Sequence, residues 1–212
     1  MPRPARVSPD RILAAAALEF AERGFGGARV DRIARRARVN KAMLYYHFKS
    51  KQGLYRTLLR RMFTLAAERM RRIASSAGPP IEKVDRAIAG LAELIREHEY
   101  FPAIMMREIA ERGVHLDRDT LRMLAAIPRA VGAIVQEGIA DGTFRPVHPV
   151  FAYFNMLAPI VMYLAAAPIR REVTHLRLLD LGTLSPDDFV RHVQDTMHRA
   201  LARGATPKVG GA

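Results

Sequence analysis

The groups best suited to chemistry lie together between residues 41 and 51. They include two cations, two phenols and one imidazole, which are Lys41, Tyr45, Tyr46, His47 and Lys51. Such side chains donate hydrogen bonds to phosphate oxygens, and cations also release the counterions that surround a nucleic acid. The pattern therefore predicts binding to a polyanion.

Two short helices are expected to position these groups. Residues 29–37 place Ile33 and Ala34 on one face, and residues 41–48 point Leu44 and Phe48 inward. Asn40 is a good N-cap at the end of the connecting turn. Two short helices joined in this way form a helix-turn-helix, whose second helix fits the major groove. Its N-terminal end would meet base edges, and this end carries Lys41, Ala42 and Met43.

The charge distribution favours the same interpretation. The chain of 212 residues holds 34 Lys and Arg against 21 Asp and Glu, a net charge of +13. Residues 1–75 hold 18 basic and 5 acidic residues, whereas the remainder is balanced at 16 of each. A general preference for arginine would not leave the remainder neutral. A basic head joined to a neutral body indicates a polyanion-binding module and a second module with another task.

The whole chain is expected to be all-α, with about nine helices and no useful strand pattern. We predict an N-terminal three-helix, helix-turn-helix DNA-binding domain over residues 1–56. A C-terminal helical ligand-binding and dimerisation bundle follows over residues 57–212, and a helix at about 51–75 bridges the two. The helices are expected at residues 9–24, 29–37, 41–48, 51–75, 81–98, 102–112, 118–140, 149–167 and 186–203.

The motif resembles the DNA-binding domain of the TetR family of bacterial transcriptional regulators. The resemblance covers about residues 8–56 and rests on Gly24-Phe25, on Val30-x-x-Ile33-Ala34-x-x-Ala37-x-Val39-Asn40-Lys41, and on Leu44-Tyr45-Tyr46-His47-Phe48-x-x-Lys51-x-x-Leu54. It implies a homodimer with two DNA-binding heads and a C-terminal ligand-binding and dimerisation domain. By matching positions, Tyr45, Tyr46, His47 and Lys51 are implied to contact phosphates, and Lys41, Ala42 and Met43 to face the bases.

Three departures from the family pattern concern this motif. Arg38 stands where the family usually has a glycine in the turn, and a left-handed arginine costs about 1 kcal/mol. Ala28 and Arg29 replace the usual Ser or Thr, which leaves Gly27 as a weak cap. We expect Arg29 and Arg38 to add phosphate contacts. Ala42 and Met43 make base readout more apolar, for example through thymine methyl groups.

Methionines and aromatic residues are frequent in the C-terminal part, where the resemblance places the effector. Met side chains adapt to varied ligand shapes, although a soft helical core would have the same composition. The predicted pocket residues are Met62, Phe63, Met105, Met106, Met123, Ile127, Phe154 and Tyr163. His98 and Asn155 are candidate polar anchors, with a purely structural role as the alternative.

Two apolar segments predict a dimer contact. Residues 149–169 carry no charge over nearly the length of a membrane span, but Asn155 and Pro159 argue against a span. A helix buried between subunits explains the same composition. In the last helix, Phe189, Val193, Met197 and Leu201 form one stripe, and the resemblance also places the dimer contact there.

Enzyme signatures are missing from the sequence. It has no Gly-x-Ser-x-Gly, no phosphate-binding loop and no His-Glu-x-x-His, and the cysteine count is zero. Asp195-x-x-His198 could be half of a metal site, but its partner pair is missing. We expect no catalytic residue, no metal site, no cofactor and a cytoplasmic protein.

The function predicted from the sequence is a ligand-responsive repressor that a small apolar effector releases from a palindromic double-stranded DNA operator, with no membrane partner. The alternative is a helical small-molecule-binding protein whose basic head binds RNA or acidic membrane.

Overall fold

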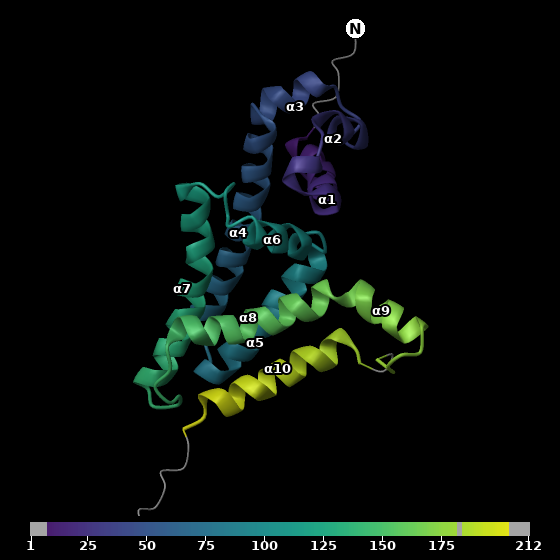
Figure 1. The fold of residues 1–212 in the computed structure, drawn as a ribbon. Helices are drawn as coiled ribbons and strands as arrows, with labels where there is room; N and C mark the ends of the chain where they lie inside the picture. The colour runs from purple at the N-terminus through teal and green to yellow at the C-terminus, as the bar shows by residue number, and fades with distance from the viewer. Residues whose placement is uncertain (1–7, 182–183, 204–212) are drawn as a thin grey trace, which may run out of the picture. The chain divides into compact units, whose positions relative to one another are not determined.

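The computed structural model describes residues 8–181 and 184–203, which form ten α-helices and no strand (Figure 1). The predicted all-α class is confirmed, with one helix more than expected. The helices are α1 (Pro9–Gly27), α2 (Val30–Arg36), α3 (Lys41–Phe48), α4 (Lys51–Ala74), α5 (Pro80–Glu97), α6 (Phe101–Ala110), α7 (Arg118–Ala140), α8 (Pro149–Ala165), α9 (Ala167–His175) and α10 (Pro186–Leu201).

The additional helix is α9, which lies between the helices expected at residues 149–167 and 186–203, where no helix was predicted; α8 ends at Ala165, two residues before the expected end. Ala166 has φ −79° and ψ 2°, and Pro168 lies in the first turn of the next helix. A proline fits a first turn because its missing N–H would have no helical partner there. The helices on either side of this break are bent by 49°.

The ends of the helices follow the capping expected from the sequence. Ser8 accepts from the backbone N–H of Asp10, and Ser185 forms a full capping box with Asp188. Gly24 interrupts α1 in the left-handed region at φ 67°, and the chain continues as a further turn to Gly27. The predicted helix stop at Gly24 is thus a kink within α1.

The chain packs as two compact units. One comprises residues 8–65 and 97–125, and the other comprises residues 66–96 and 126–203 without the two residues at 182–183. The borders fall within α4, at the end of α5 and within α7, not near residue 56. The expected border at residue 56 marks the end of the DNA-binding motif. Whether it is also a border between domains stays a prediction.

The first unit has its core between α1, the helix-turn-helix and the first half of α4. Ile12, Phe20, Ile33 and Leu44 are buried, and α1 contacts both α2 and α6. The rings of Phe20 and Tyr55 meet edge to face at 4.6 Å. Because Leu44 of α3 is part of this core, the core holds α3 in place.

In the second unit α8 packs against α10, and the loop after α7 contacts the C-terminal end of α10. Phe144 is buried, and its backbone forms an isolated bridge with Ala202 at the end of α10. The Phe144 ring lies directly on Gly138, where an added Cβ would come within 2.2 Å of its Cδ2. Only glycine leaves room for the ring there.

Within residues 8–181 and 184–203, two parts of the chain are long and apolar enough to cross a membrane. They are α7 and the bent pair of α8 and α9. The first of these was not expected from the sequence, whereas the second overlaps the uncharged residues 149–169. Helices in a protein core meet the same criterion, and Val131, Ile134 and Val135 of α7 are buried.

Candidate nucleic-acid interface

The turn between α2 and α3 has the left-handed residue that the motif requires. Arg38 adopts φ 51°, and the residue is exposed. The N–H of Val39 reaches back to the carbonyl of Ala34 at 2.9 Å. Arginine therefore takes over the conformation usually given to glycine, at a cost of about 1–2 kcal/mol.

Asn40 begins α3 and orients its N-terminus. Its Oδ1 accepts from the N–H of Ala42 at 2.8 Å, which confirms the predicted cap. Leu44 and Phe48 are buried as expected, and they fix the helix on the core. The opposite face is therefore available to a partner.

The exposed face of α3 carries the residues expected to bind DNA. Lys41 and Ala42 are exposed, Met43 and His47 are half-buried, and Tyr46 is 71% exposed. The Nε2 atom of His47 is covered and has no hydrogen-bond partner within the described residues. A phosphate contact from this side chain would therefore have to use Nδ1.

An ion pair that sequence reasoning missed joins the base-facing end of α3 to α2. Nζ of Lys41 lies 2.9 Å from Oδ1 of Asp31. The hydrogen bond and the charge of Lys41 lower the pKa of Asp31, and those of Asp31 raise the pKa of Lys41. Lys41 must share or leave this partner to reach a base edge.

The carboxylate of Glu19 in α1 accepts a hydrogen bond from the backbone at the start of α2. From the sequence, Gly27 was expected to be the N-cap of this helix. The cap position belongs to Arg29, whose side chain makes no capping bond. Instead its N–H donates to the buried Glu19 carboxylate at 3.2 Å, and Arg32 Nε donates to the same oxygen at 2.5 Å. Burial would raise the pKa of Glu19, but these bonds outweigh it and lower the pKa. The side chain of Arg29 remains exposed.

Lys51 lies between the end of α1 and the start of α4. Its Nζ donates to the carbonyl oxygens of Phe25 at 2.8 Å and Ala28 at 3.1 Å. It also lies 4.5 Å from the centre of the Phe25 ring. Lys51 thus braces the segment before α2, a role that the resemblance did not suggest.

The start of α4 is capped by Ser50, whose hydroxyl accepts from the N–H of Gly53 at 2.9 Å. A Cβ at Gly53 would come within 2.1 Å of the Phe48 carbonyl, so a side chain cannot be placed there without a shift. The glycine lets α4 begin directly under the end of α3.

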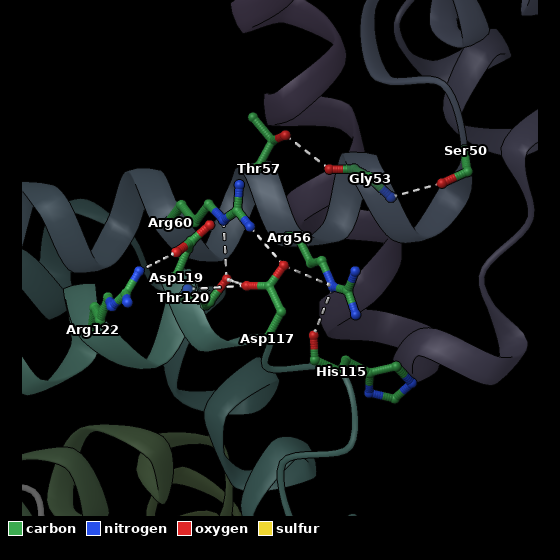
Figure 2. Close-up of polar contacts among 10 residues, drawn as sticks. All are labelled: Ser50, Gly53, Arg56, Thr57, Arg60, His115, Asp117, Asp119, Thr120 and Arg122. Atoms are coloured by element: carbon green, nitrogen blue, oxygen red, sulfur yellow. Dashed lines mark hydrogen bonds and ion pairs between the residues drawn. The ribbon is translucent and has the colours of Figure 1, made fainter.

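Asp117 ties the first half of α4 to the start of α7 (Figure 2). Its carboxylate accepts from Arg60 Nη2 at 2.6 Å and from the N–H and hydroxyl of Thr120 at 3.0 and 2.7 Å. Arg56 Nε lies 3.5 Å from the same carboxylate and donates to the His115 carbonyl at 3.1 Å. The hydrogen bond from Arg60, followed by those from Thr120, lowers the pKa of Asp117 far below its ordinary value.

The residues predicted to line an effector pocket are divided between the two units. Phe63 is buried and its ring meets Phe101 at 5.9 Å, whereas Met105 and Met123 are half-buried and Met106 is exposed. Met62 lines a groove of about 420 Å³, together with Leu13, Leu58, His98 and Tyr100. His98, a candidate polar anchor for the effector, therefore lines the same groove as Met62.

The remaining predicted pocket residues lie in the second unit. Ile127 is buried in α7, and Phe154 is 55% exposed on α8. Tyr163 stacks on Phe189 at 4.0 Å, and its hydroxyl donates to the Leu184 carbonyl at 3.0 Å. Asn155 is exposed. The assignment of these residues to a ligand pocket stays a prediction.

Two family models match the chain. Residues 12–58 match bacterial regulatory proteins of the tetR family, and residues 80–181 match a tetracyclin repressor-like C-terminal domain. The chain belongs to the tetR family of bacterial regulatory proteins. The resemblance seen in the helix-turn-helix is thus confirmed, and it extends over the second domain.

Curated relatives of this TetR-family regulator are transcriptional repressors. It is 25% identical over 198 residues to the HTH-type transcriptional repressor NicS of Pseudomonas putida, covering 92% of both chains. It is 33% identical over 139 residues to the repressor KstR2 of Mycolicibacterium smegmatis, covering 65% of this chain and 67% of KstR2.

Among solved structures, the fold is similar to that of the transcriptional regulator FadR from Bacillus subtilis in complex with stearoyl-CoA. The TM-score is 0.71 at 18% identity, over 94% of this chain and all of FadR. The TetR-family protein is therefore a DNA-binding transcriptional regulator.

Proposed function

We propose that this TetR-family regulator is a homodimeric repressor that inserts α3 of each subunit into successive major grooves of a near-palindromic operator. The observation that carries the proposal is the orientation of α3. Leu44 and Phe48 are buried, while Lys41, Ala42, Tyr45 and Tyr46 face solvent. Because a recognition helix must present its polar face outward, this arrangement suits groove binding.

An apolar stripe on α8 supports the homodimer. Phe151, Phe154 and Met162 are 67%, 55% and 61% exposed, and they lie on the face opposite the buried Met156 and Ile160. Exposed large side chains in one stripe are typical of surfaces that bury each other in an oligomer. This also explains the uncharged composition of residues 149–169 without a membrane. We further propose that the protein acts in the cytoplasm and has no catalytic activity.

We propose a small apolar effector that releases the operator. FadR, with a similar fold, was crystallised with stearoyl-CoA, which favours a ligand with an apolar portion. The effector would shift α4, whose start Lys51 ties to Phe25. Release then requires that the effector bind the conformation unsuited to DNA more tightly than the other one.

The test is binding of the full chain to labelled DNA from upstream of its own gene, by fluorescence anisotropy at several salt concentrations. Saturable binding to one palindrome, with affinity falling steeply as salt rises, is expected. Tyr46→Ala should weaken this binding about tenfold without changing the circular dichroism spectrum. Arg191→Ala, an exposed substitution on α10, serves as the control.

Equal binding to random DNA, RNA and acidic vesicles would overturn the proposal in favour of a general polyanion-binding head. Unchanged operator affinity of Tyr46→Ala would remove the phosphate contact assigned to that residue.

A further inference from the structure

Two carboxylates and an imidazole meet at the C-terminal end of α6. Oε1 of Glu108 lies 2.8 Å from Nδ1 of His115, and Oε2 of Glu111 lies 3.5 Å from the same nitrogen. One potential ligand atom from each residue lies within 4.8 Å of the other two. The repressor function proposed above does not use this cluster.

The backbone after α6 brings His115 back to the helix. Arg112 and Gly113 both adopt left-handed conformations, at φ 59° and 69°. The N–H of Gly113 donates to the carbonyl of Glu108 at 2.7 Å, so the chain reverses tightly. The turn therefore places an imidazole over the last turn of α6.

Glu108 provides an independent indication of a missing partner. Its side chain is 2% exposed, and Oε1 already accepts from the Tyr55 hydroxyl at 2.7 Å. Oε2 is covered and has no hydrogen-bond partner within the described residues. A buried carboxylate oxygen without a donor is costly, and a cation would satisfy it.

We propose that Glu108, Glu111 and His115 bind one divalent transition-metal ion of the zinc type, with water completing its coordination. Imidazole and carboxylate ligands suit Zn²⁺, whereas Mg²⁺ prefers oxygen ligands alone. Zn²⁺ holds such ligands at about 2.0–2.2 Å, so ligand atoms that lie within 4.8 Å of one another need only small shifts. The ion has a path from solvent, because the Glu111 side chain is 44% exposed.

The site lies against the DNA-binding motif within the same compact unit. The ring of His115 is 4.1 Å from that of Phe25, which follows the kink at Gly24. Lys51 donates a hydrogen bond to the backbone carbonyl of the same Phe25. A bound ion would hold the α6–α7 turn against the end of α1 and so rigidify the support of α2 and α3.

The experiment uses the untagged full chain after treatment with EDTA and removal of the chelator. Isothermal titration calorimetry with ZnCl₂ should give one ion per chain, and MgCl₂ at the same concentration should give no saturable heat. Because the metal binds the folded chain, Zn²⁺ should also raise Tm. Glu111→Gln should weaken Zn²⁺ binding at least tenfold. Glu111 is preferred over Glu108 because its removal leaves the Tyr55 hydrogen bond intact.

His198→Gln is the matched control, since His198 pairs with the Asp85 carboxylate at 2.8 Å in the second unit. Its Zn²⁺ affinity should equal that of the wild type. His115→Gln is the second ligand variant, and circular dichroism checks its fold. The proposal is overturned by the absence of one-to-one binding, or by folded Glu111→Gln and His115→Gln variants that bind Zn²⁺ as the wild type does.

Discussion

The ammonium of Lys51 lies 2.8 Å from the carbonyl oxygen of Phe25, so the first residue of α4 completes the end of α1. Because Ala28 accepts from the same ammonium, the lysine holds the segment immediately before α2. The sequence resemblance implies a phosphate contact for Lys51. In the structure Lys51 instead stabilises the segment before α2. An experiment must therefore distinguish this stabilising role from a contact with phosphate.

Lys51→Met should reduce the free energy of unfolding by about 1–3 kcal/mol, because two charge-assisted hydrogen bonds and the cation–π contact with Phe25 are lost. Urea denaturation measures this change. Lys49→Met is the control, since the ammonium of the exposed Lys49 contacts only Tyr46 among the described residues, at its carbonyl oxygen and its ring. A Lys51 variant with wild-type stability but weaker operator binding would mean that its role is the phosphate contact alone.

Arg38→Gly should stabilise the protein by about 0.5–1 kcal/mol. Glycine relieves the strain of the left-handed turn, and part of this gain is offset by the larger entropy of the unfolded chain. The same change at Arg35, inside α2, should instead destabilise by about 1 kcal/mol. Denaturation midpoints of the two variants compare these effects. A loss of stability in Arg38→Gly would show that the arginine side chain contributes more than the strain costs.

Asp117→Asn should destabilise the protein by about 1–3 kcal/mol at pH 7, since Arg60 and the buried Thr120 lose a charged acceptor. The folded pKa of Asp117 is lowered from 3.8 by the hydrogen bonds from Arg60 and Thr120. Its stabilising effect is therefore complete well above pH 3.8 and is lost as the pH falls through the lower folded value.

Thermal unfolding between pH 7 and pH 2 measures this dependence. The difference in Tm between wild type and Asp117→Asn should shrink toward acid pH. A constant difference would mean that the carboxylate acts through packing and not through its charge.

Phe154→Asp should shift the protein from dimer to monomer, because an aspartate in the stripe of α8 would be desolvated between subunits. Sedimentation velocity at several concentrations measures the mass. Leu178→Asp replaces a more exposed apolar residue outside α8, at 72% against 55% for Phe154, and should leave the dimer intact. An unchanged dimer in Phe154→Asp would place the contact on another surface.

The sequence alone determined the elements and the polarity of the DNA-binding motif. Ser8, Asn40 and Ser185 each cap the helix they precede, because capping depends on a side chain and N–H groups two or three residues away. The inward positions Leu44 and Phe48 followed from helical periodicity in the same way. The spacing of Tyr45, Tyr46, His47 and Lys51 was enough to indicate the family.

Only the tertiary structure decided which partners these side chains have. Lys41 with Asp31, Glu19 with Arg29 and Lys51 with Phe25 join residues ten or more positions apart, so no local pattern reports them. Helix α9 was not predicted, although the end of α8 falls within two residues of the expected one, because Pro168 suits both the stop of one helix and the first turn of the next. Glu108, Glu111 and His115 became a cluster only through the reversal at Arg112 and Gly113, since backbone conformation and not residue type sets where the imidazole lies.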